Sequence, residues 1–204
     1  MLGLAVRALS RPRRADLAVM AEPLDFYGLN YYFPTRIAAG TPPAGATNPD
    51  GESAAMDELP FHLAPWPQYR RTGFGWPVAP DQLGVLLRQM GERYGAALPP
   101  VVVTEGGASF PDAPATGERG APGEVDDRER IDYLAEHIAA AAEGAPGVRV
   151  LGYYVWSLLD NWEWAAGFTQ RFGLVHVDFD TGTRTPKRSF GWLREVLAAR
   201  RPPP

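Results

Sequence analysis

The stretch VVVTEGGASF, residues 101–110, is the part of the chain from which the fold can be inferred. Four of its first five residues are β-branched, which suits a fully buried β-strand. The apolar run stops at Glu105, and Gly106 and Gly107 follow directly. A carboxylate between a buried strand and a glycine turn is typical of a site at the carboxyl end of a barrel strand. A glutamate that only caps the strand end or forms an ion pair there would give the same ten residues. Other parts of the sequence are therefore needed to distinguish a structural from a functional role of Glu105.

The composition is that of a globular protein with one domain or somewhat more. The chain has 204 residues, of which 45% are hydrophobic and 22% charged. Its 22 glycines and 21 prolines predict long ordered loops between the regular elements. The formal net charge is −4, and no basic stripe alternates with aromatic residues, which argues against a nucleic-acid partner.

Cysteine and hydropathy bear on the cellular compartment. The chain has no cysteine, which excludes disulfides and thiol catalysis and fits a reducing compartment. No stretch approaches the ~18 apolar residues of a membrane span. The charges of Arg11, Arg13 and Arg14 follow the apolar start of the chain, whereas a secretory signal places its charges first. We therefore expect a cytoplasmic protein without a membrane partner.

Helical and strand patterns alternate along the chain. We expect helices at about residues 15–22, 80–95, 126–143 and 187–199, and strands at 24–33, from Val101 onward, and at 148–160. Asp126 or Asp127 would cap the third helix, and the charge run DDRER at 126–130 would be its solvated start. Such alternation predicts right-handed βαβ units and a parallel sheet. Residues 38–75 have no clear periodicity, and the aromatic residues at their end favour an active-site loop.

The segment YYVWSLLDNWEWAAGFTQRFGLVHVD, residues 153–178, has the chemistry of a sugar-binding site. It places Trp156, Glu163 and Trp164 at and beyond a strand end, with Phe172 a short loop later. An indole face packs against the C–H face of a pyranose, and a carboxylate accepts two hydroxyl protons. The alternative is that the tryptophans are core residues, and we expect this for Trp162.

At these residues the sequence resembles glycoside hydrolase family 1, the retaining β-glucosidase and β-galactosidase family. The resemblance covers about residues 15–198, through DFYGLNYY, GWPVAPDQL, VTEGGASF, RIDYL and VWSLLDNWEWAAGFTQRFGLVHVDFDTGTRTPKRSFGW. It implies an α/β fold, namely the carboxyl-terminal three strand–helix units (strands 6 to 8) of a (β/α)8 TIM barrel. Residues 1–204 would then form a single partial glycosidase domain with tails at 1–14 and 200–204.

The resemblance also implies roles for individual residues. Glu105 would be the catalytic nucleophile, and Tyr32 the phenol that hydrogen-bonds its carboxylate. The residues that it implies for substrate binding are Asn30, Trp76, Trp156, Glu163, Trp164 and Phe172. Among them, Glu163 and Trp164 would bind the outer hydroxyls of the sugar, and Trp156 would lie under its ring. The family usually has asparagine after the nucleophile, where this chain has Gly106, and this difference bears on the geometry of the turn.

The chain lacks the segment that carries the family's second catalytic carboxyl group, the general acid/base. Retaining hydrolysis uses a nucleophile and a general acid/base about 5 to 5.5 Å apart. The family's acid/base glutamate lies after the fourth strand in an Asn-Glu-Pro segment, and this sequence has none. Glu163 is a poor substitute because the resemblance commits it to sugar hydroxyls. Since loss of general acid catalysis typically costs ~10² to 10⁴ in rate, we expect little or no turnover by the chain alone.

The partial barrel also bears on association and on function. Three of eight barrel strands would leave two open parallel edges, so the chain should aggregate, dimerise or need a complementary amino-terminal half. The alternative function is a non-catalytic sugar-binding or interaction module derived from the family. The choice between glucose, galactose and other sugars stays open, although Glu163 disfavours 6-phospho sugars. We expect no cofactor, and no metal site, because His62, His137 and His176 are scattered without metal-ligand spacing.

Overall fold

The computed structural model describes residues 13–42, 59–114 and 125–199. The tails predicted at 1–14 and 200–204 lie almost wholly outside these ranges, as does the middle of the long excursion predicted at 38–75. None of the helices in the described ranges combines the length and the apolar character needed to cross a bilayer.

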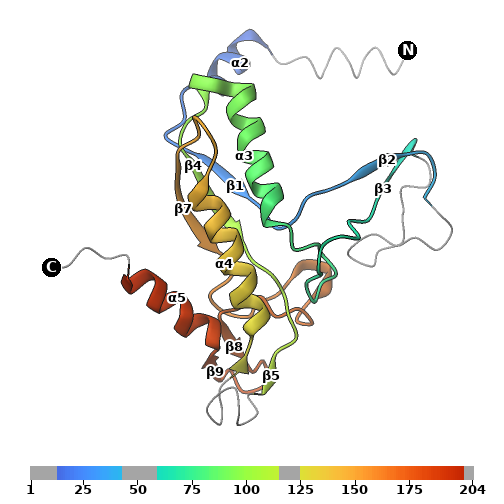
Figure 1. Cartoon of the computed structure of the whole chain (residues 1–204), viewed down its shortest axis with the longest axis vertical. Coiled ribbons are helices and arrows are strands. Elements are labelled where there is room, and N and C mark those ends of the chain that lie inside the picture. The colour runs from blue at the N-terminus through green and yellow to red at the C-terminus, as the bar shows by residue number, and fades with distance from the viewer. Residues whose placement is uncertain (1–12, 43–58, 115–124, 200–204) are drawn as a thin grey trace.

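The centre of the fold is a three-stranded parallel sheet. Its strands are β1 (Tyr27–Asn30), β4 (Val101–Gly106) and β7 (Val150–Val155), in the order β1-β4-β7. Helix α3 (Pro80–Tyr94) connects β1 to β4, and α4 (Arg128–Glu143) connects β4 to β7. Both helices lie on the same side of the sheet (Figure 1). The predicted alternation and parallel pairing are therefore confirmed, although β1 and β7 are shorter than the strands expected at 24–33 and 148–160.

Helix α3 begins and packs as its sequence predicts. Pro80 stands at the start, where its missing N–H costs no intrahelical bond. Leu83, Leu87 and Met90 are buried on one face and pack with Val101 and other strand residues in one core cluster. A second core cluster lies between α4 and the carboxyl-terminal segment, and Tyr153 of β7 packs against both clusters.

The start of α4 differs from the prediction. Asp127 stands at the N-cap position, but its side chain forms no capping hydrogen bond. Asp127 and Arg130 are buried, with 3% and 1% of their surfaces exposed, so the expectation of a solvated charge run is wrong for these two residues. They pair with each other, with Arg130 Nε 2.9 Å from Asp127 Oδ2, and both also contact distant segments. The Ser189 N–H donates to Asp127 Oδ1 at 2.9 Å, and Arg130 Nη1 donates to the Phe172 carbonyl at 3.4 Å. A run of charges looks like helix surface in a sequence, because nothing local reveals a partner from a distant segment.

The remaining elements are short. They are the helices α2 (Arg14–Met20) and α5 (Arg188–Ala199), the 3-10 turns η1 (Gly95–Ala97) and η2 (Trp164–Ala166), and three antiparallel hairpins. The hairpins pair β2 (Ile37–Ala39) with β3 (Phe61–Leu63), β5 (Ala113–Pro114) with β6 (Val125–Asp126), and β8 (Val175–Val177) with β9 (Arg184–Pro186). Strands of two or three residues are too short to show alternation, and the sequence therefore did not predict them. The β2–β3 hairpin extends away from the sheet (Figure 1).

The face of the sheet opposite α3 and α4 is poorly covered. Tyr153 of β7 packs against the core on the helix side, so the next residue, Tyr154, points to the other face, where it is 65% exposed. Leu151, on the same edge strand, is 52% exposed. Parallel sheets are usually buried on both faces. The described part of the chain therefore presents an apolar sheet surface that a complete α/β domain would cover.

A buried histidine should make the fold sensitive to acid. His137 on α4 is fully buried, its ring stacks on Tyr133 with centroids 3.9 Å apart, and its Nδ1–H donates to the Tyr133 carbonyl at 2.8 Å. Burial lowers the pKa of His137 from 6.5 to about 4. Between these values the unfolded chain binds a proton that the folded chain does not, so the free energy of unfolding falls as the pH falls.

We expect this loss of stability to reach about 1.4 kcal/mol per pH unit between pH 6.5 and pH 4. His137→Phe keeps the aromatic stack and removes the titrating group, so its stability should depend less on pH in this window. The control is His62→Phe, which should keep the acid sensitivity of the unaltered chain. Urea unfolding followed by circular dichroism at several pH values measures the difference. Equal pH dependence in the unaltered chain and His137→Phe would refute the assignment.

Candidate active site

The carboxyl end of β4 carries the half-buried Glu105. The hydroxyl of Tyr32 donates to Glu105 Oε2 at 2.7 Å, and the N–H of Tyr31 donates to the Glu105 carbonyl at 2.9 Å. Burial, followed by the bond to Glu105, raises the pKa of Tyr32 well above its usual value. The phenol is therefore a permanent donor to the carboxylate. Asn30 is paired with Glu105 in the strand register, but its side-chain oxygen accepts a bond from Thr104 Oγ1 at 2.7 Å.

The two glycines after Glu105 allow a close approach between strand ends. A Cβ built on Gly107 would lie 1.8 Å from the carbonyl oxygen of Trp156, and the Trp156 N–H donates to the Gly106 carbonyl at 3.0 Å. A Cβ on Gly106 would lie 2.2 Å from the hydroxyl oxygen of Tyr153. The Tyr153 side chain thus fills the space that a side chain at position 106 would need. This is a physical reason for glycine where the family resemblance leads one to expect asparagine.

Gly107→Ala is expected to destabilise the chain by about 3 kcal/mol or more, because the backbone of Trp156 cannot move aside as a flexible side chain could. The matched control is Gly84→Ala in the middle of α3, where nothing lies within 4 Å of the added Cβ. That substitution should stabilise the helix by roughly 0.5 to 1 kcal/mol. Urea unfolding of the two variants provides the measurement. A tolerated alanine at position 107 would show that the two strand ends do not approach as described.

An aromatic cluster lies beside Tyr32 and Glu105. The ring of Trp76 lies 5.6 Å from that of Tyr32 and 5.8 Å from that of Phe172, and Phe172 meets Tyr32 edge-on at 6.5 Å. Phe172 is only 1% exposed, so it lies beneath the cluster. The structure therefore brings together Tyr32, Trp76 and Phe172. The sequence analysis missed Phe74, which stacks on Trp76 at 4.7 Å, although the nearby GFGW motif contains both.

The loop after β7 carries the predicted sugar-binding residues. Trp156 Nε1 donates to Glu163 Oε2 at a long 3.5 Å. Burial raises the pKa of Glu163, the Trp156 bond lowers it, and the negative charge of Glu105 raises it. Trp164 is 83% exposed.

Trp162 is not a core residue. It is 62% exposed, and its ring meets the exposed Phe168 edge-on at 5.2 Å. The prediction that Trp162 belongs to the core is therefore wrong for the described chain. The physical reason is that β7 ends at Val155, so Trp162 lies in the loop beyond the sheet.

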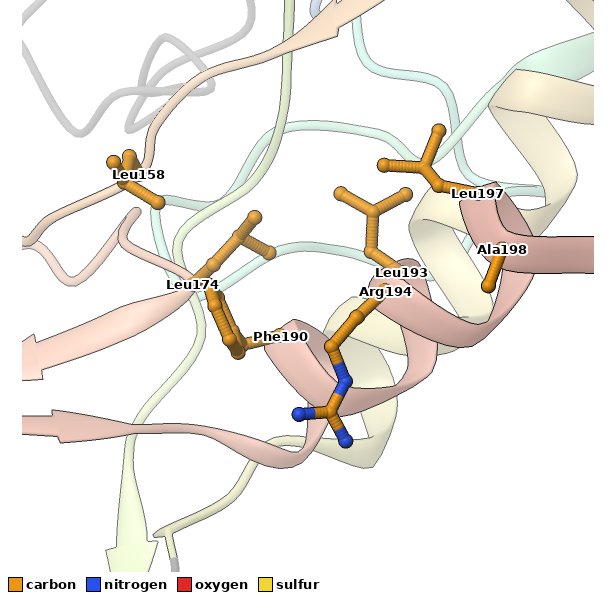
Figure 2. Close-up of a pocket in the computed structure, with 7 residues that line it drawn as sticks. All are labelled: Leu158, Leu174, Phe190, Leu193, Arg194, Leu197 and Ala198. Atoms are coloured by element: carbon orange, nitrogen blue, oxygen red, sulfur yellow. The ribbon is translucent and has the colours of Figure 1, made fainter. Parts of the chain in front are cut away.

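Two further features are made of residues outside the predicted site. One is an apolar pocket of about 440 Å³ between α5 and the segments that carry Leu158 and Leu174 (Figure 2). None of the predicted site residues lines it, and its lining suits contact with apolar protein surface. The other is a group of Asp112, Asp160 and His176, whose ligand atoms lie within 4.8 Å of one another. The Lys187 ammonium lies 3.0 Å from both carboxylates and supplies the positive charge between them.

Parallel strands, crossover helices and a carboxylate at a strand's carboxyl end define the class: an α/β protein with the site geometry of (β/α)8 enzymes. The chain belongs to Glycosyl hydrolase family 1, whose family model matches residues 8–202. The chain is 39% identical to a β-glucosidase of Agrobacterium sp. over 184 residues, which are 90% of this chain and 36% of the relative. It is 37% identical to β-glucosidase A of Thermotoga maritima, covering 89% of this chain and 36% of the relative.

Solved structures agree with this assignment. A psychrophilic β-glucosidase from Micrococcus antarcticus has a TM-score of 0.75 at 35% identity, covering 94% of this chain and 41% of that one. The family 1 β-glucosidase of Thermotoga maritima in complex with isofagomine lactam has a TM-score of 0.70 at 34% identity, covering 90% and 37%. The chain thus spans well under half the length of the relatives it matches, and it represents part of the family's (β/α)8 fold.

Proposed function

We propose that this chain is a single partial domain that carries the nucleophile and most of one sugar subsite of a retaining, β-glucosidase-like glycoside hydrolase. It would supply strands 6 to 8 of the barrel as β1, β4 and β7. The observation that carries the proposal is the 2.7 Å bond from Tyr32 to Glu105, beside the Trp156–Glu163 pair on the neighbouring strand end. The substrate would be a terminal non-reducing β-D-glucosyl residue or a related sugar.

The proposed first step is attack by a Glu105 carboxylate oxygen on the anomeric carbon. A carbon–oxygen bond to Glu105 forms while the bond to the leaving group breaks, which gives a covalent glycosyl-enzyme. Tyr32 donates to Oε2 and so leaves Oε1 free to attack. The leaving oxygen takes its proton from the general acid/base, and this sequence has no Asn-Glu-Pro segment to supply that group.

The other predicted residues would bind the sugar. Trp156 would lie under the ring, Glu163 and Trp164 would bind its outer hydroxyls, and Trp76 with Phe172 would form the wall behind Tyr32. Asn30 would contribute at the β1 end. A 6-phospho sugar is disfavoured because Glu163 would repel its phosphate. The cytoplasmic location stays a prediction.

We further propose that the chain becomes an active hydrolase only when additional protein packs against the sheet. The exposed side chains Leu151 and Tyr154 of the edge strand β7, together with the apolar pocket beside α5, suit packing of further strand–helix units. A complementary amino-terminal half would supply both that cover and the acid/base. Self-association is the other means of covering this surface. The missing acid/base favours a second candidate function, a non-catalytic sugar-binding or interaction module.

The test is mass spectrometry of the chain after incubation with 2,4-dinitrophenyl 2-deoxy-2-fluoro-β-D-glucoside. Dinitrophenolate leaves without a proton, so the first step needs no general acid, and the fluorine slows hydrolysis of the adduct. We expect one glycosyl adduct on the peptide that contains Glu105. Sugar binding without an adduct, even with an amino-terminal half supplied, would favour the module.

A further inference from the structure

A buried lysine joins the two loops that carry the proposed site. Lys187 precedes α5, and its side chain is fully buried. Its ammonium lies 3.0 Å from Asp112 Oδ1, in the loop after β4, and 3.0 Å from Asp160 Oδ1, in the loop after β7. Asp112 follows Glu105 by seven positions, and Asp160 precedes Glu163 by three. One cation thus connects the nucleophile loop, residues 106–112, with the sugar loop, residues 156–172.

Asp160 also ties the sugar loop to the chain that follows it. Its side chain is fully buried and accepts from the Gly173 N–H at 2.8 Å and from the Val177 N–H at 3.3 Å. Arg171 Nη1 lies 3.3 Å from Asp160 Oδ2. The carboxylate is therefore held at several points, and its position fixes the start of the loop that ends at Phe172.

Arg130 provides a second link between the same loops. Its Nη1 donates to the carbonyl of Ala108 and, at 3.4 Å, to the carbonyl of Phe172. Ser109 Oγ donates to Gln170 Oε1 at 2.7 Å, which adds a neutral link. Lys187 differs from these links because its ammonium lies 3.0 Å from a carboxylate in each loop. His176 Nδ1 also lies near both carboxylates, 2.7 Å from Asp112 Oδ2 and 3.5 Å from Asp160 Oδ2. Without Lys187, Arg130 at 3.5 Å from Asp112 and Arg171 at 3.3 Å from Asp160 would each compensate one carboxylate, but no ammonium would lie between the two loops, and the repulsion between the carboxylates would be weakly screened.

We propose that Lys187 is a positioning residue, which holds the sugar loop against the nucleophile loop and so keeps Glu163 and Trp156 in place relative to Glu105. This inference rests on the proposed function for its catalytic meaning, whereas the loop geometry is measurable by itself. Loss of the cation should let the two carboxylates separate. Glu105 and the sugar-binding residues would then no longer be held at a fixed spacing, although the sheet and its helices would remain.

Because the chain has no cysteine, pairs of engineered cysteines can carry spin labels. One pair replaces the exposed Pro111 and Ala165 and spans the two loops; the other replaces the exposed Arg88 on α3 and Ala135 on α4 and reports on the fold. In Lys187→Met we expect the distance distribution of the loop pair to broaden and that of the helix pair to stay unchanged. The matched control is Arg188→Met, whose guanidinium pairs with Asp126 at 2.8 Å and bridges neither loop.

The outcomes are distinct. Broadening confined to the loop pair, with no change in Arg188→Met, supports the positioning role. An unchanged loop pair, or equal broadening of both pairs, would overturn it, because the lysine would then be either dispensable or needed for the whole fold. Labelling of Glu105 by the fluoro glucoside should be about 10²-fold slower in Lys187→Met. If the unaltered chain takes no label, the proposed function fails while the distance measurement still decides the role of Lys187.

Discussion

Glu105→Gln is expected to abolish the glycosyl adduct that the activated 2-fluoro glucoside forms with this chain. Glutamine keeps the size of the side chain, and its carbonyl oxygen can still accept the bond that Tyr32 donates at 2.7 Å. The amide oxygen is a far weaker nucleophile than a carboxylate, so attack on the anomeric carbon should slow by at least ~10⁴-fold. Intact-mass measurements over time give the labelling rate.

Two further variants separate the nucleophile from other carboxylates. Glu92→Gln changes an exposed glutamate on α3 and should leave the labelling rate unchanged. Glu163→Gln should weaken sugar binding, so it should raise the concentration of reagent needed for labelling while the adduct still forms on Glu105. If Glu105→Gln were labelled as fast as the unaltered chain, Glu105 would not be the nucleophile.

Turnover of glycosides by the chain alone should be slow. The purified chain is expected to hydrolyse aryl β-glucosides at a rate lower by ~10² to 10⁴ or more than the same chain joined by a complementary half that carries the acid/base. The reason is that the leaving oxygen in the chain alone has no proton donor, and Glu163 would be occupied by sugar hydroxyls. The loss should grow with the pKa of the leaving group, being smallest for dinitrophenyl and largest for alkyl glucosides.

Steady-state assays across a series of leaving groups measure this dependence. The control is Glu105→Gln assayed with the same complementary half, which should stay inactive because the added acid/base cannot replace the nucleophile. Rapid hydrolysis of an alkyl β-glucoside by the purified chain would contradict the prediction. It would mean that a carboxyl group within the chain serves as the acid.

The sequence predicted the sheet and its helices well, because the evidence for them is local. Val101 to Thr104 are β-branched and form a strand, and the leucine spacing of α3 matches its buried face. The predictions from sequence were wrong where the tertiary structure determines whether a side chain is buried. Arg130 looked like part of a solvated charge run and proved to be buried, and Trp162 was expected in the core and proved to be exposed.

By itself the sequence determined the parallel α/β arrangement, the family, and the glutamate that ends β4 before a glycine turn. These follow from periodicity, turn chemistry and long matching motifs, all of which are properties of neighbouring residues. Only the tertiary structure decided how the strand ends meet. Tyr153 fills the space over Gly106, the Trp156 N–H donates to the Gly106 carbonyl, and Lys187 lies between two loops that carry the candidate site. Such contacts depend on strand register and on which loops converge, so no single stretch of sequence contains them.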